Sequence, residues 1–288
     1  MPALVSLLVL TLLAACSSTA STEPASTPTT APSEATRPAP ETVAPTAPPA
    51  NLWQPSPAAT WQIQFVGEPI NTDYDVDIYF LDLFDTSAEL VAGLHQRGRR
   101  AVCYISAGSW EDWRPDAADF PEAVLGAHYE GWPGERWLNI RALDPLAPIM
   151  EARLDLCAAK GFDGVDPDNL DGFTNATGFP LSQADTLAYA RWLAAAAHAR
   201  GLAIGLKNAT ELAETLAADF DWMLTESCFT QGWCAETAPF LNAGKPVFAI
   251  EYGDEGMVLD DFCVQAADLS IRAILKEWNL GEWVEFCE

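Results

Sequence analysis

The sequence predicts an α/β fold, a (β/α)8 TIM barrel preceded by a disordered N-terminal linker. From residue 61 onward, short apolar runs alternate with longer stretches of helical periodicity. Eight such runs over about 240 residues are what a (β/α)8 barrel requires. An open doubly wound sheet needs fewer strands and usually a glycine-rich phosphate loop, and no GxGxxG motif follows the first run. We therefore expect a closed barrel.

The N-terminal residues predict export. Residues 3–15 form an apolar run that suits a signal peptide, since a membrane-spanning helix needs about 20 residues. The run ends in Leu13-Ala14-Ala15-Cys16, which resembles a bacterial lipobox with Cys16 as the acylated residue; the alternative is an ordinary cleavage site. We expect an exported protein, either a lipoprotein of the bacterial cell envelope or a secreted protein, that meets the membrane only through a lipid anchor.

A polar linker separates this signal from the predicted barrel. Residues 17–50 are almost entirely Ser, Thr, Ala, Pro and Glu. Such a stretch buries too little apolar surface to offset chain entropy, so we expect a disordered tether. The predicted organisation is a signal peptide with lipobox over 1–16, a linker over 17–50 and one barrel domain over 51–288.

Each expected strand is a short apolar run, and each expected helix repeats apolar residues every three or four positions. Pro145 after Asp144 suits a helix start, and Thr86 with Glu89 fits a capping box. The expected strands are Trp61–Phe65, Asp77–Leu83, Ala101–Ile105, Gly164–Asp166, Ala203–Leu206, Trp222–Thr225, Val247–Glu251 and Ala273–Lys276. The expected helices are Ser87–Arg97, Leu146–Lys160, Gln183–Arg200, Ala209–Ala218 and Glu236–Ala243.

The charge of the chain argues against several classes of partner. The 41 acidic and 15 basic residues give a net charge of −26, which would repel nucleic acid and anionic membrane surfaces. A cationic partner would be attracted, although a merely soluble, self-repelling surface is the alternative. Only three His residues are present, which argues against a His-rich metal site. We expect a monomer that needs no metal and no cofactor.

The cysteines suggest disulfides. Apart from Cys16 there are six, an even number in a chain that we expect to be exported to an oxidising compartment. A zinc site is the weaker alternative, because no CxxC spacing occurs. One of the 15 possible arrangements pairs Cys103 with Cys157, Cys228 with Cys234, and Cys263 with Cys287.

Polar residues follow the predicted strands at the end where TIM barrels carry their active sites. Few of them are basic, and all 11 Trp residues follow residue 51. Apolar sugar faces stack on aromatic rings, and cleavage of a glycosidic bond needs two carboxyl groups, so the pattern favours a sugar site. The tryptophans expected at strand starts or in loops are Trp61, Trp110, Trp113, Trp132 and Trp233, and packing is an equally good explanation for each. The polar residues include Asp82, Asp85, Ser106, Asp166, Asp168, Asp171, Lys207, Asn208, Glu226, Glu251 and Tyr252.

The acidic cluster of Asp166, Asp168 and Asp171 favours a functional role. Asp166 and Asp168 share one face of a strand, and two carboxylates pointing into a barrel disfavour folding unless they are paired or used. Their mutual repulsion raises the proton affinity of at least one of them. A calcium loop is the alternative, but the D-x-D-x-x-D-G spacing departs from an EF-hand and Thr177 stands where its Glu belongs.

Several motifs resemble the endo-α-1,4-polygalactosaminidases of glycoside hydrolase family 114 over nearly all of 61–288. The resemblance implies a TIM barrel with a catalytic pair on the fourth and sixth strands, here Asp168 and Glu226. It also implies a substrate of α-1,4-linked galactosamine, in part deacetylated and hence cationic, which the negative charge of the domain would attract. The motifs are Trp61-Gln62-Ile63-Gln64-Phe65, Asp82-Leu83-Phe84-Asp85, Cys103-Tyr104-Ile105-Ser106-Ala107-Gly108, Asp163-Gly164-Val165-Asp166-Pro167-Asp168-Asn169, Gly205-Leu206-Lys207-Asn208 and Glu226-Ser227-Cys228-Phe229.

We therefore expect a glycosidase that cuts a galactosamine-containing polysaccharide internally and with retention of configuration. Asp168 would attack the anomeric carbon while Glu226 acts as acid and then as base. The alternatives are a tethered sugar-binding barrel without catalysis and a metal-dependent hydrolase that uses the three Asp residues. The residues expected to hold the sugar are Asp82, Tyr104, Trp110, Asp166, Asp171, Lys207, Asn208 and Tyr252.

Overall fold

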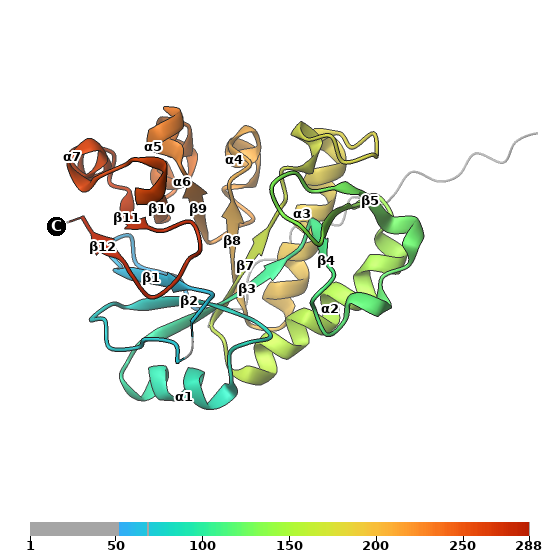
Figure 1. Ribbon diagram of the computed structural model, residues 1–288, viewed down its shortest axis with the longest axis horizontal. Helices are drawn as coiled ribbons and strands as arrows, with labels where there is room; N and C mark the ends of the chain where they lie inside the picture. Colours follow the sequence, from blue (N-terminus) through green and yellow to red (C-terminus); the bar gives the residue numbers. More distant parts are fainter. Residues whose placement is uncertain (1–51, 68, 288) are drawn as a thin grey trace, which may run out of the picture. The chain divides into compact units, whose positions relative to one another are not determined.

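The computed structural model describes residues 52–67 and 69–287 (Figure 1). The predicted signal peptide, lipobox and linker lie outside the described residues. In the described ranges, no helix is both long and apolar enough to cross a bilayer.

The predicted barrel is confirmed: eight parallel strands follow one another around a curled sheet, and every one lies within two residues of its expected bounds. A short ninth strand, β12, pairs antiparallel with β11 at the end of the sheet. In sheet order the strands are β1 (Trp61–Gln64), β2 (Ile78–Asp82), β3 (Arg100–Ser106), β7 (Gly164–Asp168), β8 (Ala203–Lys207), β9 (Trp222–Glu226), β10 (Val247–Tyr252), β11 (Arg272–Lys276) and β12 (Glu285–Phe286).

Helices cover the outside of the sheet, and the five expected ones are present, two of them shortened and partly replaced by 3-10 turns. The sequence analysis missed α5 and α7, and the described residues between β1 and β2 form no helix. Two expected helix starts were also wrong. The first helix is capped by Ser87 rather than by Thr86, and the second begins at Leu143, so that Asp144 lies inside it instead of capping it. The helices are α1 (Ala88–Gln96), α2 (Leu143–Lys160), α3 (Gln183–Ala199), α4 (Ala213–Leu216), α5 (Cys228–Gln231), α6 (Ala238–Asn242) and α7 (Leu259–Leu269).

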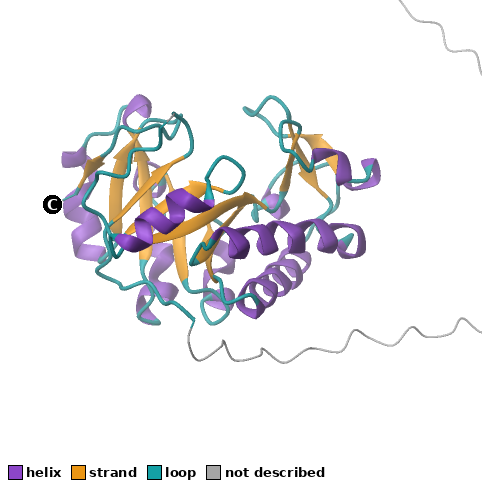
Figure 2. Ribbon diagram, turned by 90° about the horizontal axis from the view of Figure 1, so that it is seen from below, coloured by secondary structure: helices purple, strands orange, loops and turns teal. Residues whose placement is uncertain are grey.

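A small antiparallel sheet interrupts the barrel between β3 and α2. Its strands are β4 (Ser109–Glu111), β5 (Leu125–His128) and β6 (Glu135–Leu138), with β6 in the middle. Figure 2 shows this sheet as a separate group of strands beside the barrel. We call residues 109–138 the arm. The sequence analysis did not predict it, because strands of three or four residues leave almost no periodic signal.

The barrel closes between β11 and β1 without a backbone ladder among the described residues. Side chains and the segment after β11 join the two edges instead. The Trp61 indole nitrogen donates to the Arg272 carbonyl at 2.9 Å, and the Phe65 amide donates to the Leu280 carbonyl at 2.9 Å. Lys276, fully buried, donates to the Gln62 side chain and the Gly281 carbonyl. These contacts satisfy polar groups that an open sheet edge would leave unpaired.

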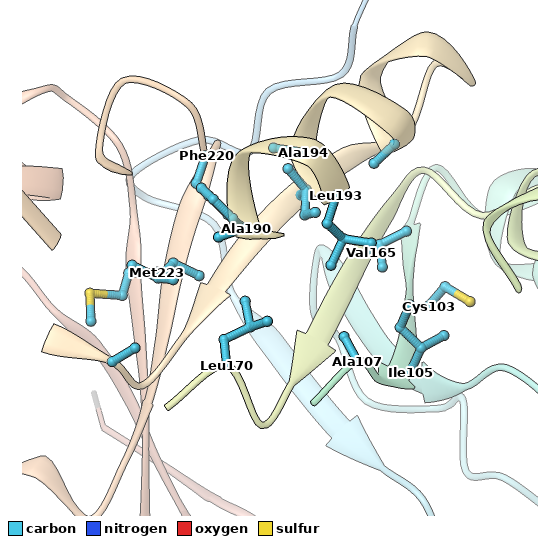
Figure 3. Packing of buried hydrophobic residues seen from close by; sticks show 14 of the residues in the cluster. Cys103, Ile105, Ala107, Val165, Leu170, Ala190, Leu193, Ala194, Phe220 and Met223 are labelled. Atoms are coloured by element: carbon cyan, nitrogen blue, oxygen red, sulfur yellow. The ribbon is translucent and has the colours of Figure 1, made fainter. Parts of the chain in front are cut away.

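Two layers of apolar packing surround the sheet. Inside the barrel, the rings of Trp61, Phe80, Trp222 and Phe248 contact one another with centroids 5.2–6.1 Å apart. Outside, Ala190, Leu193 and Ala194 of α3 pack toward Val165 of β7, with Cys103 and Ile105 of β3 nearby (Figure 3). Since both faces are buried, the strands are continuous apolar runs, which is why their positions could be predicted.

All three expected disulfides are present: Cys103–Cys157, Cys228–Cys234 and Cys263–Cys287. The first ties β3 to α2, the second fixes the turn after β9, and the third ties α7 to the segment after β12. Covalent links of this kind stabilise a fold chiefly by restricting the unfolded chain.

Trp222 fills the barrel only because glycines stand opposite it. A Cβ atom on Gly205 would lie 2.1 Å from the indole nitrogen of Trp222, and one on Gly164 would lie 2.7 Å from its ring. We expect Gly205→Ala to lower the free energy of unfolding by about 1–3 kcal/mol through overpacking. Denaturant titration measures this change. Gly93→Ala in α1 is the control, because its Cβ meets nothing within 4 Å; equal stability of the two variants would contradict the packing argument.

Candidate active site

A cavity of about 440 Å³ opens at the carboxyl ends of the barrel strands. Residues at the ends of β3, β7, β8, β9 and β10 form its floor, the arm forms one wall, and residues 278–280 form part of another. Six carboxylates line it, on Asp85, Glu111, Glu135, Asp168, Asp171 and Glu226, against the two cationic side chains of Arg114 and Lys207. The cavity therefore carries an excess of acidic groups.

Lys207 joins two of these carboxylates at the floor. Its ammonium lies 3.4 Å from Oδ1 of Asp168 and 3.0 Å from Oε2 of Glu226, although the lysine side chain is only 2% exposed. Burial alone would lower the pKa of Lys207, but the charges of Asp168, Glu226 and Asp166 outweigh it and raise the pKa well above the usual range. The site thus holds a permanent cation between the two predicted catalytic carboxylates.

The end of the β7–β8 ladder makes room for this lysine. The two strands pair only at Gly164 with Ala203 and Val165 with Ile204. Pro167 has no N–H to donate, so it cannot continue a ladder toward β8. The ladder therefore ends before Asp168 and Lys207, which are the last residues of the two strands.

Asp168 is held by neighbours on β3 and in its own turn. The Tyr104 hydroxyl donates to Oδ2 at 3.2 Å, and the Asn169 amide donates to Oδ1 at 2.8 Å. Asn169 adopts a left-handed φ of 66°, and its side chain donates to the hydroxyls of Ser106 and Ser109 at 3.0 Å. Its carbonyl also lies so close to Gly108 that a Cβ there would clash at 1.6 Å. The turn that aims Asp168 is therefore fixed on several sides.

Glu226 accepts hydrogen bonds from three side chains. Tyr252 donates to Oε1 at 2.5 Å, while Asn208 and Lys207 donate to Oε2 at 3.1 and 3.0 Å. The Asn208 side chain also accepts from the Glu226 amide at 2.9 Å. Burial acts to raise the pKa of Glu226, but the charge of Lys207 and these hydrogen bonds outweigh it and lower the pKa. In the free protein Glu226 is ionised at neutral pH.

Three residues predicted to hold the sugar do not line the cavity. Asp82 forms a salt bridge with Arg114 at 2.8 Å and accepts hydrogen bonds from two amides that follow in its own turn. Trp110 donates its indole N–H to the Ala117 carbonyl within the arm. Asp166 is fully buried. The structure therefore gives these residues supporting positions, while the other expected residues, Tyr104, Asp171, Lys207, Asn208 and Tyr252, line the cavity.

Asp166 is unusual because neither carboxylate oxygen has a hydrogen-bond partner among the described residues. Burial, with the charges of Asp168 and Glu226, raises its pKa to about 7, while Lys207 opposes the shift. A buried carboxyl without hydrogen bonds disfavours folding. The positive charge of Lys207 stabilises the ionised form of Asp166.

Sequence reasoning missed the acidic groups that the arm contributes. Glu135 accepts a hydrogen bond from Ser109 at 2.7 Å, and burial with the charges of Glu111 and Asp168 raises its pKa to about 7. Glu111 forms a bidentate pair with Arg114. Burial also raises the pKa of Asp171, to about 6. No pattern in the sequence marks Glu111 or Glu135, because only the fold of the arm turns them toward the cavity.

The described residues contain one convergent group of potential metal ligands, formed by Cys228, Cys234 and Glu251. The two cysteines are joined in a disulfide, and Glu251 accepts hydrogen bonds from the amides of Phe229 and Thr230. These bonds use the ligand atoms within the protein. The three Asp residues of the predicted acidic cluster form no such group in the described part of the chain.

Comparison with known proteins identifies the family. The sequence model of glycoside hydrolase family GH114 matches residues 42–288. The chain belongs to glycoside hydrolase family GH114.

Solved structures support this assignment. Ega3 from Aspergillus fumigatus, crystallised in complex with galactosamine, is 40% identical, with a TM-score of 0.78 over 82% of this chain and 97% of that chain. The glycoside hydrolase domain of PelA from Pseudomonas aeruginosa shares the fold at 17% identity, with a TM-score of 0.61 over 78% of this chain and 96% of that chain. An uncharacterised protein from Deinococcus radiodurans is 29% identical over 209 residues, which are 65% of this chain and 67% of that protein. The GH114 protein is a glycosidase with a carbohydrate substrate.

The raised pKa of Asp166 predicts how the stability of the GH114 barrel depends on pH. A carboxyl of an unfolded chain titrates near pH 4, whereas Asp166 in the folded protein has a pKa of about 7. Between these values the folded state keeps a proton that the unfolded chain has lost, so stability falls as pH rises through this window. We expect Asp166→Asn to reduce the loss of thermal stability between pH 4 and pH 7.

Thermal unfolding across this pH range measures the effect. Asp171 and Glu135 add to the fall in stability with pH, so the slope should decrease without vanishing. The control is Asp268→Asn, which changes an exposed acid of α7. An unchanged slope in Asp166→Asn would contradict the argument.

Proposed function

We propose that this glycosidase hydrolyses α-1,4-linked, partly deacetylated galactosamine polymers internally and with retention of configuration, with Asp168 as nucleophile and Glu226 as acid and base. The observation that carries the proposal is the bridge that Lys207 makes between these carboxylates at the floor of the cavity. Both groups line the cavity, so a sugar can reach them.

The bridge supports retention. Lys207 contacts one oxygen of Asp168 at 3.4 Å and one of Glu226 at 3.0 Å. One ammonium therefore contacts both carboxylates, which brings these two oxygens close together, whereas inverting enzymes keep their carboxyl groups roughly 6.5–9.5 Å apart so that a water molecule fits between them. Retaining enzymes hold the groups roughly 5–5.5 Å apart, since one of them bonds directly to the sugar.

In the first step, an Asp168 oxygen bonds to the anomeric carbon as the bond to the leaving oxygen breaks, and Glu226 gives its proton to that oxygen. In the second step, water attacks the same carbon, Glu226 takes the proton of the water, and the bond to Asp168 breaks. The Lys207 ammonium stabilises whichever carboxylate is ionised. Tyr252 and Asn208 hold Glu226 in place through both steps.

The charges of the cavity support a cationic substrate. Six lining carboxylates face two cations, and Arg114 is already engaged by Glu111 and Asp82. Free 2-amino groups on galactosamine would be protonated and attracted to such a surface. The similarity to Ega3, whose structure contains galactosamine, favours the same sugar. Internal cleavage remains a prediction from the family resemblance.

A sugar-binding barrel without catalysis is the second candidate. Such a protein would need the same cavity but no paired carboxylates. A binding role alone therefore does not explain why Lys207 bridges two carboxylates. The metal-dependent hydrolase is disfavoured because Lys207 supplies a cation at Asp168, one of the three Asp residues that would have to bind the metal.

We also propose that the protein is exported. Three disulfides in the described residues suit an oxidising compartment. Acylation of Cys16 would tether the protein to the cell envelope, and the polar linker would carry the barrel away from the membrane.

Removing either catalytic carboxylate should abolish activity without unfolding the barrel. We expect Asp168→Asn and Glu226→Gln each to lower kcat by at least roughly a hundredfold, measured as reducing ends released from partly deacetylated galactosaminogalactan. Thermal unfolding is the control for folding. A variant with wild-type turnover would remove that residue from the mechanism.

Azide distinguishes the two roles on an aryl α-galactosaminide. Azide replacing the nucleophile in Asp168→Gly should give the β-azide, whereas azide replacing the base in Glu226→Ala should give the α-azide. The opposite pattern would exchange the two assignments.

Tyr252 should set the alkaline limit of activity. Its hydroxyl donates to Glu226 and favours the ionised form, but the first step needs Glu226 protonated. Tyr252→Phe removes this donor, so the pKa of Glu226 should rise and the alkaline limb of the kcat/KM profile should move to higher pH.

The pH dependence of kcat/KM tests this expectation. Tyr74→Phe is the control, because Tyr74 lies outside the cavity lining and donates to the Glu282 carbonyl. A shift of the alkaline limb to lower pH in Tyr252→Phe would show that the limb reports another group.

A further inference from the structure

Three tryptophans that line the cavity have large exposed surfaces that folding does not explain, and Trp113 is the most exposed of them at 51%. Trp132 is 40% exposed and Trp278 is 44% exposed, and both line the cavity. In contrast, Trp61 and Trp222 are buried inside the barrel. An exposed indole gains little from the hydrophobic effect, so a rim that keeps three of them suggests a ligand with an apolar face. Two of them, Trp132 and Trp278, contact each other.

The two indoles meet although they come from elements far apart in the chain. Trp132 lies in the turn between β5 and β6 of the arm, and Trp278 follows β11. Their ring centroids are 5.9 Å apart and their planes are inclined by only 24°, a stacked arrangement. The stacked pair leaves 40% of Trp132 and 44% of Trp278 exposed, and we call this pair the platform.

The backbone holds both indoles in place. The Trp132 amide donates to the Tyr129 carbonyl, and its own carbonyl accepts from the Glu135 amide. The Trp278 amide donates to the carboxylate of Asp254 at 3.1 Å. Fixed turns of this kind present the rings without the entropy loss that mobile loops would incur on binding.

Two consecutive contacts connect the platform to Glu226. The Trp278 ring meets the Tyr252 ring with centroids 4.6 Å apart, and the Tyr252 hydroxyl donates to Glu226. In the proposed mechanism Glu226 protonates the leaving oxygen, so the sugar beyond that oxygen lies on this side.

We propose that Trp132 and Trp278 form a subsite for a hexosamine ring of the polymer on the leaving-group side of the scissile bond, stacking on its apolar face. This inference rests on the proposed function for the orientation of the chain. A pyranose ring has an apolar face of C–H groups that an indole can cover. The subsite would favour substrates long enough to reach it, as internal cleavage requires.

Kinetics on galactosamine oligomers of two lengths test the subsite in the full chain. Trp132→Ala and Trp278→Ala should each raise KM for an octamer about tenfold, with kcat little changed, and should affect a short oligomer much less. Trp132→Phe should restore most of the loss. Trp283→Ala is the matched control, since Trp283 is 39% exposed but does not line the cavity.

Equal effects on both lengths, an effect matched by Trp283→Ala, or a lower melting temperature with unchanged KM would overturn the subsite. Calorimetric titration of the octamer into the Glu226→Gln background separates this inference from the proposed function. If the wild type releases no reducing ends, the proposed function fails, and weaker octamer binding in the two Ala variants would still support the subsite. Unchanged binding, or no octamer binding at all, would overturn it.

Discussion

The candidate active site depends on one ion-pair network, in which the buried Lys207 ammonium lies between the partly exposed carboxylates of Asp168 and Glu226. Burying the Lys207 ammonium disfavours folding unless it is paired, and the two carboxylates at 3.4 and 3.0 Å compensate its charge. The raised pKa of Lys207 shows that the attraction outweighs burial for the cation. The same attraction draws the two carboxylates together, which suits them to act on one bond.

The barrel meets the geometric demands of this network through strained turns at the strand ends. Asn169, Asn208 and Ser227 have φ values of 66°, 48° and 53° and directly follow Asp168, Lys207 and Glu226. Non-glycine residues adopt this left-handed conformation at some cost in free energy, which the surrounding structure must offset. Asn169 and Asn208 contribute to that offset through side-chain hydrogen bonds at 3.0 and 3.1 Å, Asn208 to Glu226 itself. Three of the six non-glycine residues with positive φ in the described part of the chain therefore directly follow the members of the ion-pair network.

The sequence predicted the barrel and most of its floor because these features are local. Strands buried on both faces are apolar runs, and the residue after each run lies at the catalytic end, which located Lys207 and Glu226. The arm has no comparable signal, so Glu111, Glu135 and Arg114 were missed. Asp82 and Trp110 lie outside the cavity lining for a related reason, because Arg114 and the Ala117 carbonyl, both in the arm, engage these side chains. Trp278 was missed because it lies beyond the last predicted strand.

The proposed cationic substrate places opposing demands on the pH at which the enzyme works. Asp171 and Glu135, with pKa values of about 6 and 7, are ionised only toward neutral pH, so attraction for an ammonium group weakens as pH falls. Glu226 has a lowered pKa and must be protonated to act as acid, so the first chemical step gains as pH falls. Binding thus favours higher pH and proton donation favours lower pH, so activity should be greatest at an intermediate pH. The pKa values within one cavity differ because burial raises those of Asp171 and Glu135, whereas direct contact with Lys207 and the hydrogen bonds from Tyr252 and Asn208 lower that of Glu226.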